Sequence, residues 1–236
     1  ETLLERLLPS GDAPPEALHR AMRHAVFPGG KRVRPRLLLT VAAACAASNG
    51  AMDLALHAAC ALELVHCASL THDDLPCFDD APLRRGRPSV HALYGEAMAV
   101  LVGDALLCRA FEALAVAPPR LARRSLQILG RLTQATGSTQ GIIGGQGLES
   151  APLATTSPEH LERYHALKTA SLFRLATEAG AIAAGSTQVA AWGQLGLELG
   201  LAYQLIDDLQ DVRHDQAHGR HVEHLPPLRA TTGHII

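Results

Sequence analysis

The chain has 236 residues, a net charge of −2 and a hydrophobic content of 47%, of which aromatic residues supply 3%. This near-neutral charge gives no sign of a nucleic-acid or anionic-membrane partner, because such surfaces attract an excess of positive charge. Alanine and leucine supply most of the apolar residues, and both favour helices over strands. We therefore predict an all-α fold in which residues 1–236 form a single domain.

Five cysteines are present, which is an odd number, and no pair has the CxxC spacing of a metal or redox site. Most of them lie in apolar runs, so we interpret them as reduced, small hydrophobic residues. The chain shows no secretory leader pattern and no uncharged apolar run of about 18 residues that would cross a membrane. We expect a cytoplasmic protein without a transmembrane segment. The cysteines are Cys45, Cys60, Cys67, Cys77 and Cys108.

The hydrophobic periodicity predicts about eight helices joined by short Gly/Pro loops, with no convincing strand. Residues 52–71 are apolar all round, which indicates a central helix. Ser157 and the proline after it are typical of a helix N-terminus. The glycine-rich residues 141–147 are interpreted as a helix break in preference to a site of close backbone approach. Further helices are expected at residues 14–27, 35–47, 90–117, 121–135 and 188–212.

Residues 72–80 hold four carboxylates, and two arginines, Arg84 and Arg85, follow them. Crowded like charges are unfavourable in a folded protein unless something neutralises them. Mg²⁺ does this well, because it prefers ligand sets made only of oxygen. Acidic runs are more often solvated helix ends. Here the run ends an apolar helix, where carboxylates are expensive to bury, and this favours a functional role.

A second acidic cluster, Asp207, Asp208 and Asp211, follows the uncharged apolar residues 199–206. Asp207 and Asp211 are four residues apart, so they share one face of a helix. If the two acidic clusters face each other, they can hold several Mg²⁺ ions, and those ions can hold a diphosphate.

A glycine turn at residues 29–30 precedes four cations in residues 31–36, at the start of a predicted helix. Backbone N–H groups, helix dipole and side-chain charge together favour an anion there. A solvated basic turn is an equal alternative on local evidence. Lys31 and Lys168 are the only lysines among 21 basic residues, which indicates that a compact ammonium is needed at both positions. His66 lies two helical turns before Asp73. We interpret it as either a core residue or a ligand.

Together these motifs resemble the trans-isoprenyl diphosphate synthases, the polyprenyl synthetase family, over roughly residues 15–215. Among them, the chain is most similar to bacterial geranylgeranyl diphosphate synthases. The resemblance implies a helical bundle around a deep central cavity, and usually a homodimer. The matching pieces are residues 29–35, His66, residues 73–79 and 84–86, residues 144–146, Lys168, Thr169, Gln204 and residues 207–211.

The resemblance also implies roles for individual residues. About three Mg²⁺ ions would bind with the allylic diphosphate, and the expected metal ligands are Asp73, Asp74, Asp79, Asp207, Asp208 and Asp211. The expected contacts to that diphosphate are Arg84, Lys168, Thr169 and Gln204. The expected contacts to the second substrate, isopentenyl diphosphate, are Lys31, Arg34, His66 and Arg85. The residues expected to assist ionisation are Asp73, Asp74, Asp79, Arg84, Lys168 and Asp207.

Ala68 and Ser69 precede the first acidic cluster, where the family's residues form a floor for the growing chain. Neither is bulky, so the resemblance predicts a twenty-carbon product, geranylgeranyl diphosphate. The alternatives are a farnesyl diphosphate synthase, a class I terpene synthase and a non-catalytic partner subunit. Terpene synthases need no isopentenyl site, which would leave Lys31, Arg34 and Arg85 without a role. Partner subunits typically lose one acidic motif, and both motifs are intact here.

The chain departs from the family's pattern after about residue 215. Relatives carry a loop with glycine and lysine after the second acidic cluster and then further helices, whereas no lysine follows Lys168 here. We expect this C-terminal part to be either truncated or joined across missing residues.

Overall fold

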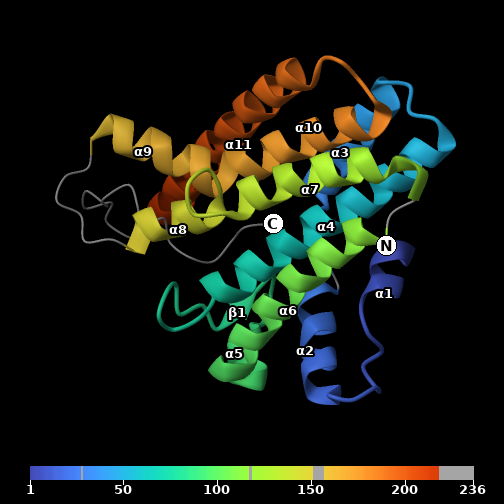
Figure 1. The fold of residues 1–236 in the computed structure, drawn as a ribbon. Coiled ribbons are helices and arrows are strands. Elements are labelled where there is room, and N and C mark those ends of the chain that lie inside the picture. The colour runs from blue at the N-terminus through green and yellow to red at the C-terminus, as the bar shows by residue number, and fades with distance from the viewer. Residues whose placement is uncertain (28, 117–118, 151–156, 218–236) are drawn as a thin grey trace.

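The computed structural model describes residues 1–27, 29–116, 119–150 and 157–217; the side chains of residues 119, 158, 208 and 210–217 lie outside this description. Helices dominate, as predicted (Figure 1). The α-helices are α1 Thr2–Leu7, α2 Glu16–Val26, α3 Val33–Ala44, α4 Asn49–Asp73, α5 Val90–Tyr94, α6 Glu96–Ala115, α7 Ala122–Thr136, α8 Ile142–Ser150, α9 Pro158–His165, α10 Ser171–Ala184 and α11 Val189–Ala217. The other elements are β1 Leu83–Arg84, β2 Arg87–Pro88, a 3₁₀ turn Pro119–Leu121 and a π-helix Ala166–Ala170.

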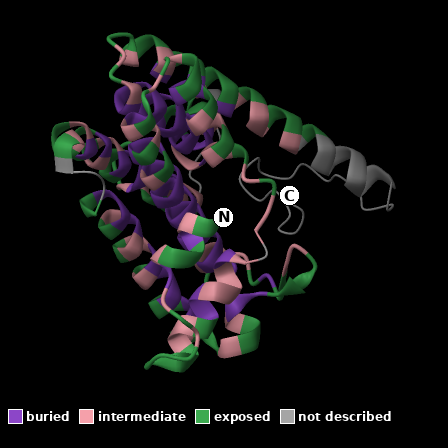
Figure 2. Ribbon diagram, turned by 90° about the vertical axis from the view of Figure 1, so that its right-hand side faces the viewer, coloured by how far each residue is buried: buried purple, intermediate pink, exposed green. Residues whose placement is uncertain are grey.

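Helix α4 is the centre of the bundle, as its all-round apolar sequence predicts (Figures 1 and 2). It packs against α6 on one side and against α3 and α10 on the other. Leu54, Leu62, Leu64 and Val65 are fully buried along it. Among the described helices it alone is long and apolar enough to cross a membrane, but most of it is buried inside the protein. It is therefore a core helix of this bundle.

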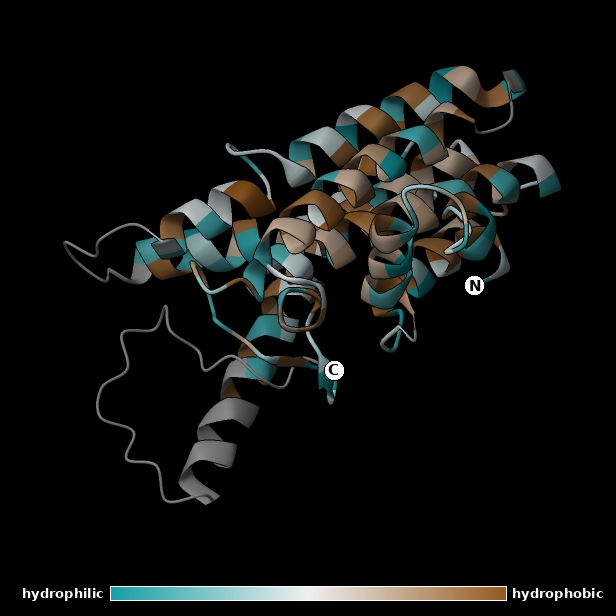
Figure 3. Ribbon diagram, turned by 90° about the horizontal axis from the view of Figure 1, so that it is seen from below, coloured by the Kyte–Doolittle hydropathy of each residue, from teal (hydrophilic) through white to brown (hydrophobic). Residues whose placement is uncertain are grey.

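The remaining helices form an outer layer around this core. Helices α7 and α11 pack on α10, and α2 packs on α6. Helices α8 and α9 both contact the π-helix at one end of the molecule. Hydrophobic residues lie along the central helices, and hydrophilic residues are interspersed on the outer ones (Figure 3).

A row of glycines allows α11 to approach α10 closely. Gly193, Gly196 and Gly200 recur at three- and four-residue spacing, so they share one face of α11. A Cβ at Gly196 would lie 2.7 Å from both the Phe173 carbonyl oxygen and the Arg174 Cα. The helix pair therefore packs backbone against backbone at this point, and long side chains are excluded.

Three local expectations from the sequence were wrong. The predicted helix 90–117 is two helices, because Gly95 adopts a φ of +88° between α5 and α6. Residues 141–147 are no helix break, since α8 begins at Ile142 and runs through them. A two-stranded antiparallel hairpin, β1–β2, was not predicted, and Gly86 in its turn has a φ of +72°. In contrast, Ser157 caps α9 as predicted, with its Oγ accepting from the His160 N–H at 3.2 Å.

We expect Gly196→Ala to destabilise the protein, because the new methyl group meets backbone atoms that cannot move aside. The expected loss is about 1–3 kcal/mol in the free energy of unfolding, measured by urea titration. Gly130→Ala is the matched control: Gly130 lies in α7 with nothing within 4 Å of its would-be Cβ. That variant should gain up to about 1 kcal/mol from helix propensity. Equal stability of the two variants would contradict close packing of α10 and α11.

Candidate functional site

A cavity of about 580 Å³ lies between α4, α8, the π-helix and α11; we call it the central cavity. It brings together residues that are distant in the sequence, as the resemblance predicts. Its polar lining includes Arg34, His66, Ser69, His72, Asp73, Asp104, Gln146, Lys168, Thr169, Tyr203, Gln204 and Asp207. Its apolar lining includes Ala68, Leu70, Phe78, Leu107, Ile142, Ile143 and Leu172.

Asp73 is the last residue of α4 and lines the central cavity. A carboxylate at a helix C-terminus faces the negative end of the helix dipole, so the position is unfavourable without a nearby cation. Burial raises the pKa of Asp73 to about 7, and Lys168 opposes this rise while Asp79 adds to it. The pKa of Asp79 is raised as well, chiefly by burial. These two carboxylates therefore form an acidic pair that a bound cation would stabilise.

Asp74 is engaged differently from its neighbour. It is buried, and Arg84 Nε donates to its Oδ1 at 2.9 Å while Arg84 Nη2 donates to the same oxygen. Burial raises the pKa of Asp74, and the Arg84 contact opposes that rise. The ion pair anchors the β1–β2 hairpin to the end of α4. Asp74 and Arg84 thus neutralise each other here, and neither lines the central cavity.

Asp207 from α11 lines the same cavity as Asp73 from α4, so the two acidic clusters meet across it. The side chains of Asp208 and Asp211, which were also expected as metal ligands, lie outside the described residues. Within the described part of the chain, no group of three or more His, Cys, Asp or Glu side chains is close enough to hold a metal ion. The donor chemistry of Asp73, Asp79 and Asp207 nevertheless suits Mg²⁺, since all are carboxylates and two carry raised pKa values.

Lys168 stands on the π-helix and forms an ion pair with Glu149 of α8. The Tyr164 hydroxyl donates to the same carboxylate at 2.8 Å. A Cβ at Gly145 would lie 2.6 Å from the Lys168 backbone nitrogen, so this glycine lets α8 touch the π-helix. Lys168 therefore lines the central cavity beside the acidic pair.

Thr169 and Gln204 join the π-helix to α11. The Thr169 hydroxyl donates to Gln204 Oε1 at 2.5 Å, and both residues line the central cavity. The π-helix places Lys168 and Thr169, two consecutive residues, on the cavity wall. π-Helical turns occur frequently at functional sites because they change which side chains face a given direction.

A cationic group lies further along α4 from the acidic pair. Arg34 Nη1 lies 3.4 Å from His66 Nε2, and the Arg34 guanidinium stacks over Phe173 with 4.9 Å to the ring centroid. Burial lowers the pKa of His66, and the nearby Arg34 and Arg85 lower it further. The imidazole is thus neutral, and its Nε2 accepts from Arg34.

The Nε atoms of Arg34 and Arg85 are both buried and have no hydrogen-bond partner among the described residues. A buried donor without a partner destabilises the fold by about 1–3 kcal/mol, so such groups normally bind a ligand or water. A Cβ at Gly30 would lie 2.8 Å from the Arg85 guanidinium, which explains the glycine there. Arg34, His66 and Arg85 together are suited to bind an anion.

Lys31 and Arg32 do not join this group. Arg32 donates to Glu63 at 2.5 Å and to Glu1 at 2.9 Å, so its charge is neutralised within the fold. Lys31 lines a separate cavity between α1, α3 and α4. The structure therefore places three of the four expected isopentenyl contacts together and directs the fourth elsewhere.

A polyprenyl synthetase family model matches residues 15–223, and the chain belongs to this family. It is 49% identical over 201 residues to the geranylgeranyl diphosphate synthase of Cereibacter sphaeroides, covering 85% of this chain and 67% of that protein. It is 48% identical over 201 residues to the enzyme of the same name from Rhodobacter capsulatus, covering 85% and 66%. The chain thus spans about two thirds of the length of these relatives.

Solved structures give the same result for the fold. An FPP/GFPP synthase from Zymomonas mobilis matches with a TM-score of 0.81 and 35% identity, over 89% of this chain and 77% of that one. A geranyltransferase from Helicobacter pylori matches with a TM-score of 0.82 and 33% identity, over 89% and 76%. The predicted family and all-α fold are confirmed.

Glu149 and Tyr203 were not singled out from the sequence, although both belong to the site. Glu149 holds Lys168, and the ring centroid of Tyr203 lies 5.1 Å from that of Phe173 beneath Arg34. Glu149 carried a signal: it is the only charged residue between Arg131 and Glu159. An isolated carboxylate in so long an uncharged stretch indicates a specific partner. Tyr203 carried no comparable signal.

We expect metal-free protein to lose stability as the pH rises through about 7, because Asp73 holds its proton in the folded state up to that pH. The unfolded carboxyl ionises near pH 4, so this contribution is complete below that pH. Asp73→Asn should therefore be more stable than the wild type at pH 8, by about 1–3 kcal/mol. Urea unfolding in EDTA at pH 5 and pH 8 measures this.

Asp12→Asn, at an exposed carboxylate in the loop before α2, is the control and should keep the wild-type pH profile. If Asp73→Asn also kept the wild-type profile, Asp73 would not be the titrating group.

Proposed function

We propose that the protein is a trans-prenyltransferase that condenses isopentenyl diphosphate with an allylic diphosphate, and that its product is geranylgeranyl diphosphate. The observation that supports this most strongly is the central cavity, which has carboxylates from α4 and α11 in one region and Arg34 and His66 in another, with the buried Arg85 near His66. Each of the two substrates carries a diphosphate, and the cavity provides a separate region for each diphosphate.

The allylic diphosphate is assigned to the acidic region. Mg²⁺ held by Asp73, Asp79 and Asp207 would neutralise charge on the departing diphosphate. Lys168, in its ion pair with Glu149, lies beside this region, and Thr169 and Gln204 add hydrogen-bonding groups. Asp74 and Arg84, which neutralise each other, would have to separate in order to act on the metal and the diphosphate as the family resemblance implies.

Isopentenyl diphosphate is assigned to Arg34, His66 and Arg85. The unpaired guanidinium N–H groups can donate hydrogen bonds to the diphosphate oxygens, and the neutral His66 can donate its ring N–H. Its alkene then attacks the allylic carbocation, and the new carbocation loses a proton to the released diphosphate, so no Ser, Cys or His nucleophile is required. Leu70, Leu107 and Leu172 on the cavity wall provide the apolar surroundings that a carbocation needs. These cations also favour a prenyltransferase over a terpene synthase.

Product length is assigned from the cavity wall beneath Asp73. Ala68 and Ser69 are small and both line the cavity, so neither blocks a growing chain. A farnesyl diphosphate synthase remains the alternative activity, and a non-catalytic partner subunit is the alternative role. We further propose a cytoplasmic homodimer, on the resemblance to the family.

Incubation with Mg²⁺, labelled isopentenyl diphosphate and dimethylallyl, geranyl or farnesyl diphosphate should give a twenty-carbon alcohol after dephosphorylation. Asp73→Ala and Asp207→Ala should each lower the rate by at least about a hundredfold, as expected when a group that stabilises transition-state charge is removed. Asp12→Ala is the exposed control and should keep the wild-type rate. Absence of condensation with every primer would favour the partner-subunit role.

Ala68→Tyr should shorten the product to fifteen carbons or fewer, because the ring would fill the cavity beneath Asp73. The readout is the ratio of product chain lengths by reversed-phase chromatography. Ala68→Ser nearly preserves the volume and should keep the wild-type product. An unchanged twenty-carbon product from Ala68→Tyr would show that the floor lies elsewhere.

A further inference from the structure

The β1–β2 hairpin carries both Arg84 and Arg85, but it is too short to hold them in place by itself. Its strands pair at two positions, Leu83 with Pro88 and Arg84 with Arg87. A two-stranded hairpin is at best marginally stable in water when nothing packs against it. Two like charges directly opposite each other, as at Arg84 and Arg87, weaken it further. The hairpin must therefore be held by contacts to the rest of the protein.

The turn of the hairpin is strained as well. Arg85 and Gly86 are its two central residues, and their φ angles are +53° and +72°. Two-residue hairpin turns often have a positive φ at both positions, where Asn, Asp or Gly is preferred. An arginine is unfavourable there, because its Cβ crowds the following carbonyl oxygen. Arg85 therefore keeps this conformation only if the strands on both sides of it are fixed.

The second strand, β2, is tied to the end of α2 by Arg87. Arg87 Nη1 donates to the Phe27 carbonyl oxygen at 2.8 Å, and Arg87 Nη2 lies 3.1 Å from His24 Nδ1. His24 Nε2 lies 2.8 Å from the Pro88 carbonyl oxygen. An imidazole with its proton on Nε2 satisfies both contacts, since Nε2 then donates to the carbonyl and Nδ1 accepts from Arg87. Arg87 and His24 thus form one network between β2 and α2.

This network lies beside the cationic group of the central cavity. The glycine turn at residues 29–30 follows α2, and a Cβ at Gly30 would lie 2.8 Å from the Arg85 guanidinium. Arg85 is also close enough to His66 to lower the pKa of that imidazole. Fixing β2 to α2 therefore fixes Arg85 relative to both Gly30 and His66. The first strand, β1, is held separately, by the ion pair of Arg84 with α4.

We propose that Arg87 is a positioning residue for Arg85. Bound to His24 and to the Phe27 carbonyl oxygen, Arg87 holds the hairpin turn so that the Arg85 guanidinium faces the bound diphosphate. Arg87 does not line the central cavity, so it acts through Arg85 and not on the substrate. This inference rests on the proposed function, because it takes isopentenyl diphosphate as the ligand of Arg85.

The test is calorimetric titration of the full chain with isopentenyl diphosphate. EDTA is present throughout, because the residues assigned to this ligand are not acidic and should not need a metal ion. Arg85→Gln should weaken binding by about tenfold. Arg87→Lys keeps the positive charge but loses the two-pronged guanidinium, and should weaken binding by about three- to tenfold. Arg87 is exposed, so thermal unfolding of this variant should match the wild type.

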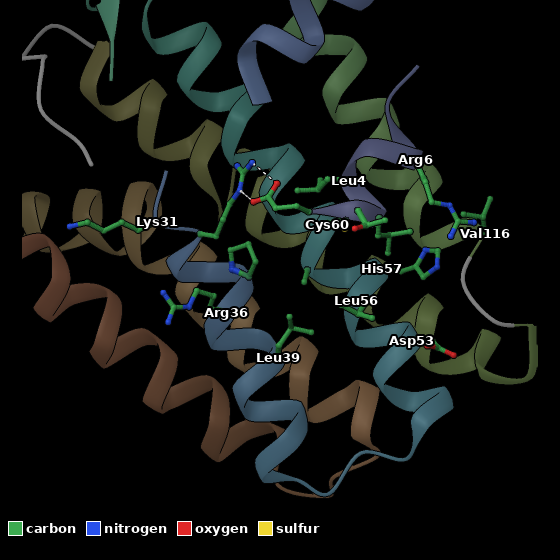
Figure 4. A pocket seen from close by; sticks show the side chains of 16 residues that line it. Leu4, Arg6, Lys31, Arg36, Leu39, Asp53, Leu56, His57, Cys60 and Val116 are labelled. Carbon is green, nitrogen blue, oxygen red and sulfur yellow. Dashed lines mark hydrogen bonds and ion pairs between the residues drawn. The ribbon is translucent and has the colours of Figure 1, made fainter. Parts of the chain in front are cut away.

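The double variant Arg85→Gln/Arg87→Lys separates positioning from direct contact. It should bind no more weakly than Arg85→Gln alone, because Arg87 has nothing left to position. His24→Ala breaks the same network from α2 and should weaken binding as Arg87→Lys does. Arg36→Gln is the control for loss of one positive charge and should bind like the wild type. Arg36 lines the separate cavity between α1, α3 and α4 (Figure 4).

Two outcomes would overturn the inference alone. The first is wild-type binding by Arg87→Lys when Arg85→Gln has lost affinity. The second is a loss from Arg87→Lys that is as large in the Arg85→Gln background as in the wild type, which would mean that Arg87 acts on the anion independently. Absence of isopentenyl diphosphate binding by the wild type would instead contradict the proposed function, and the inference with it.

Discussion

The structure depends on ionisable side chains that lie along a buried helix. Helix α4 holds Glu63, His66 and Asp73, all removed from bulk water to a large extent. A buried charge without compensation costs several kcal/mol, so each group constrains whatever packs beside it. Glu63 forms an ion pair with Arg32 at 2.5 Å. His66 stays neutral beside Arg34, and Asp73 lies near Lys168. The positions of α3 and the π-helix follow from these needs.

The basic segment at the start of α3 divides its cations among three destinations. Arg32 adopts a left-handed backbone with a φ of +52°, directly before the helix begins. Its guanidinium is bound by carboxylates, while Arg34 lines the central cavity and Arg36 lines the separate cavity between α1, α3 and α4. One short turn therefore borders both cavities. A change in the packing of α1 or α3 would disturb the Arg32–Glu63 ion pair and, through it, the position of Arg34.

Much of the fold and part of the site could be predicted from the sequence. Helix α4 was recognisable because it is apolar all round, and Asp73 and Asp207 because each begins an acidic cluster directly after an apolar run. The direction of Lys31 could not be predicted, because a basic run does not specify which way each side chain turns after a glycine. Nor could the Asp74–Arg84 pair, since Arg84 reaches it only through the hairpin geometry. The break between α5 and α6 was not predicted either, because a single glycine in an apolar run does not by itself specify the positive φ that Gly95 adopts.

The π-helix between α9 and α10 has a consequence for how this chain tolerates change in its length. Ala166–Ala170 accommodates more residues per turn than an α-helix, so it acts as a one-residue insertion within a continuous helical segment. Removing one residue there would let the segment revert to a regular α-helix, while the helical turns on either side keep their relative orientation. Lys168 and Thr169 lie within the π-helix, so they would lose the geometry that places both of them on the cavity wall. Single-residue deletions in this stretch should therefore be rarer among working relatives than substitutions.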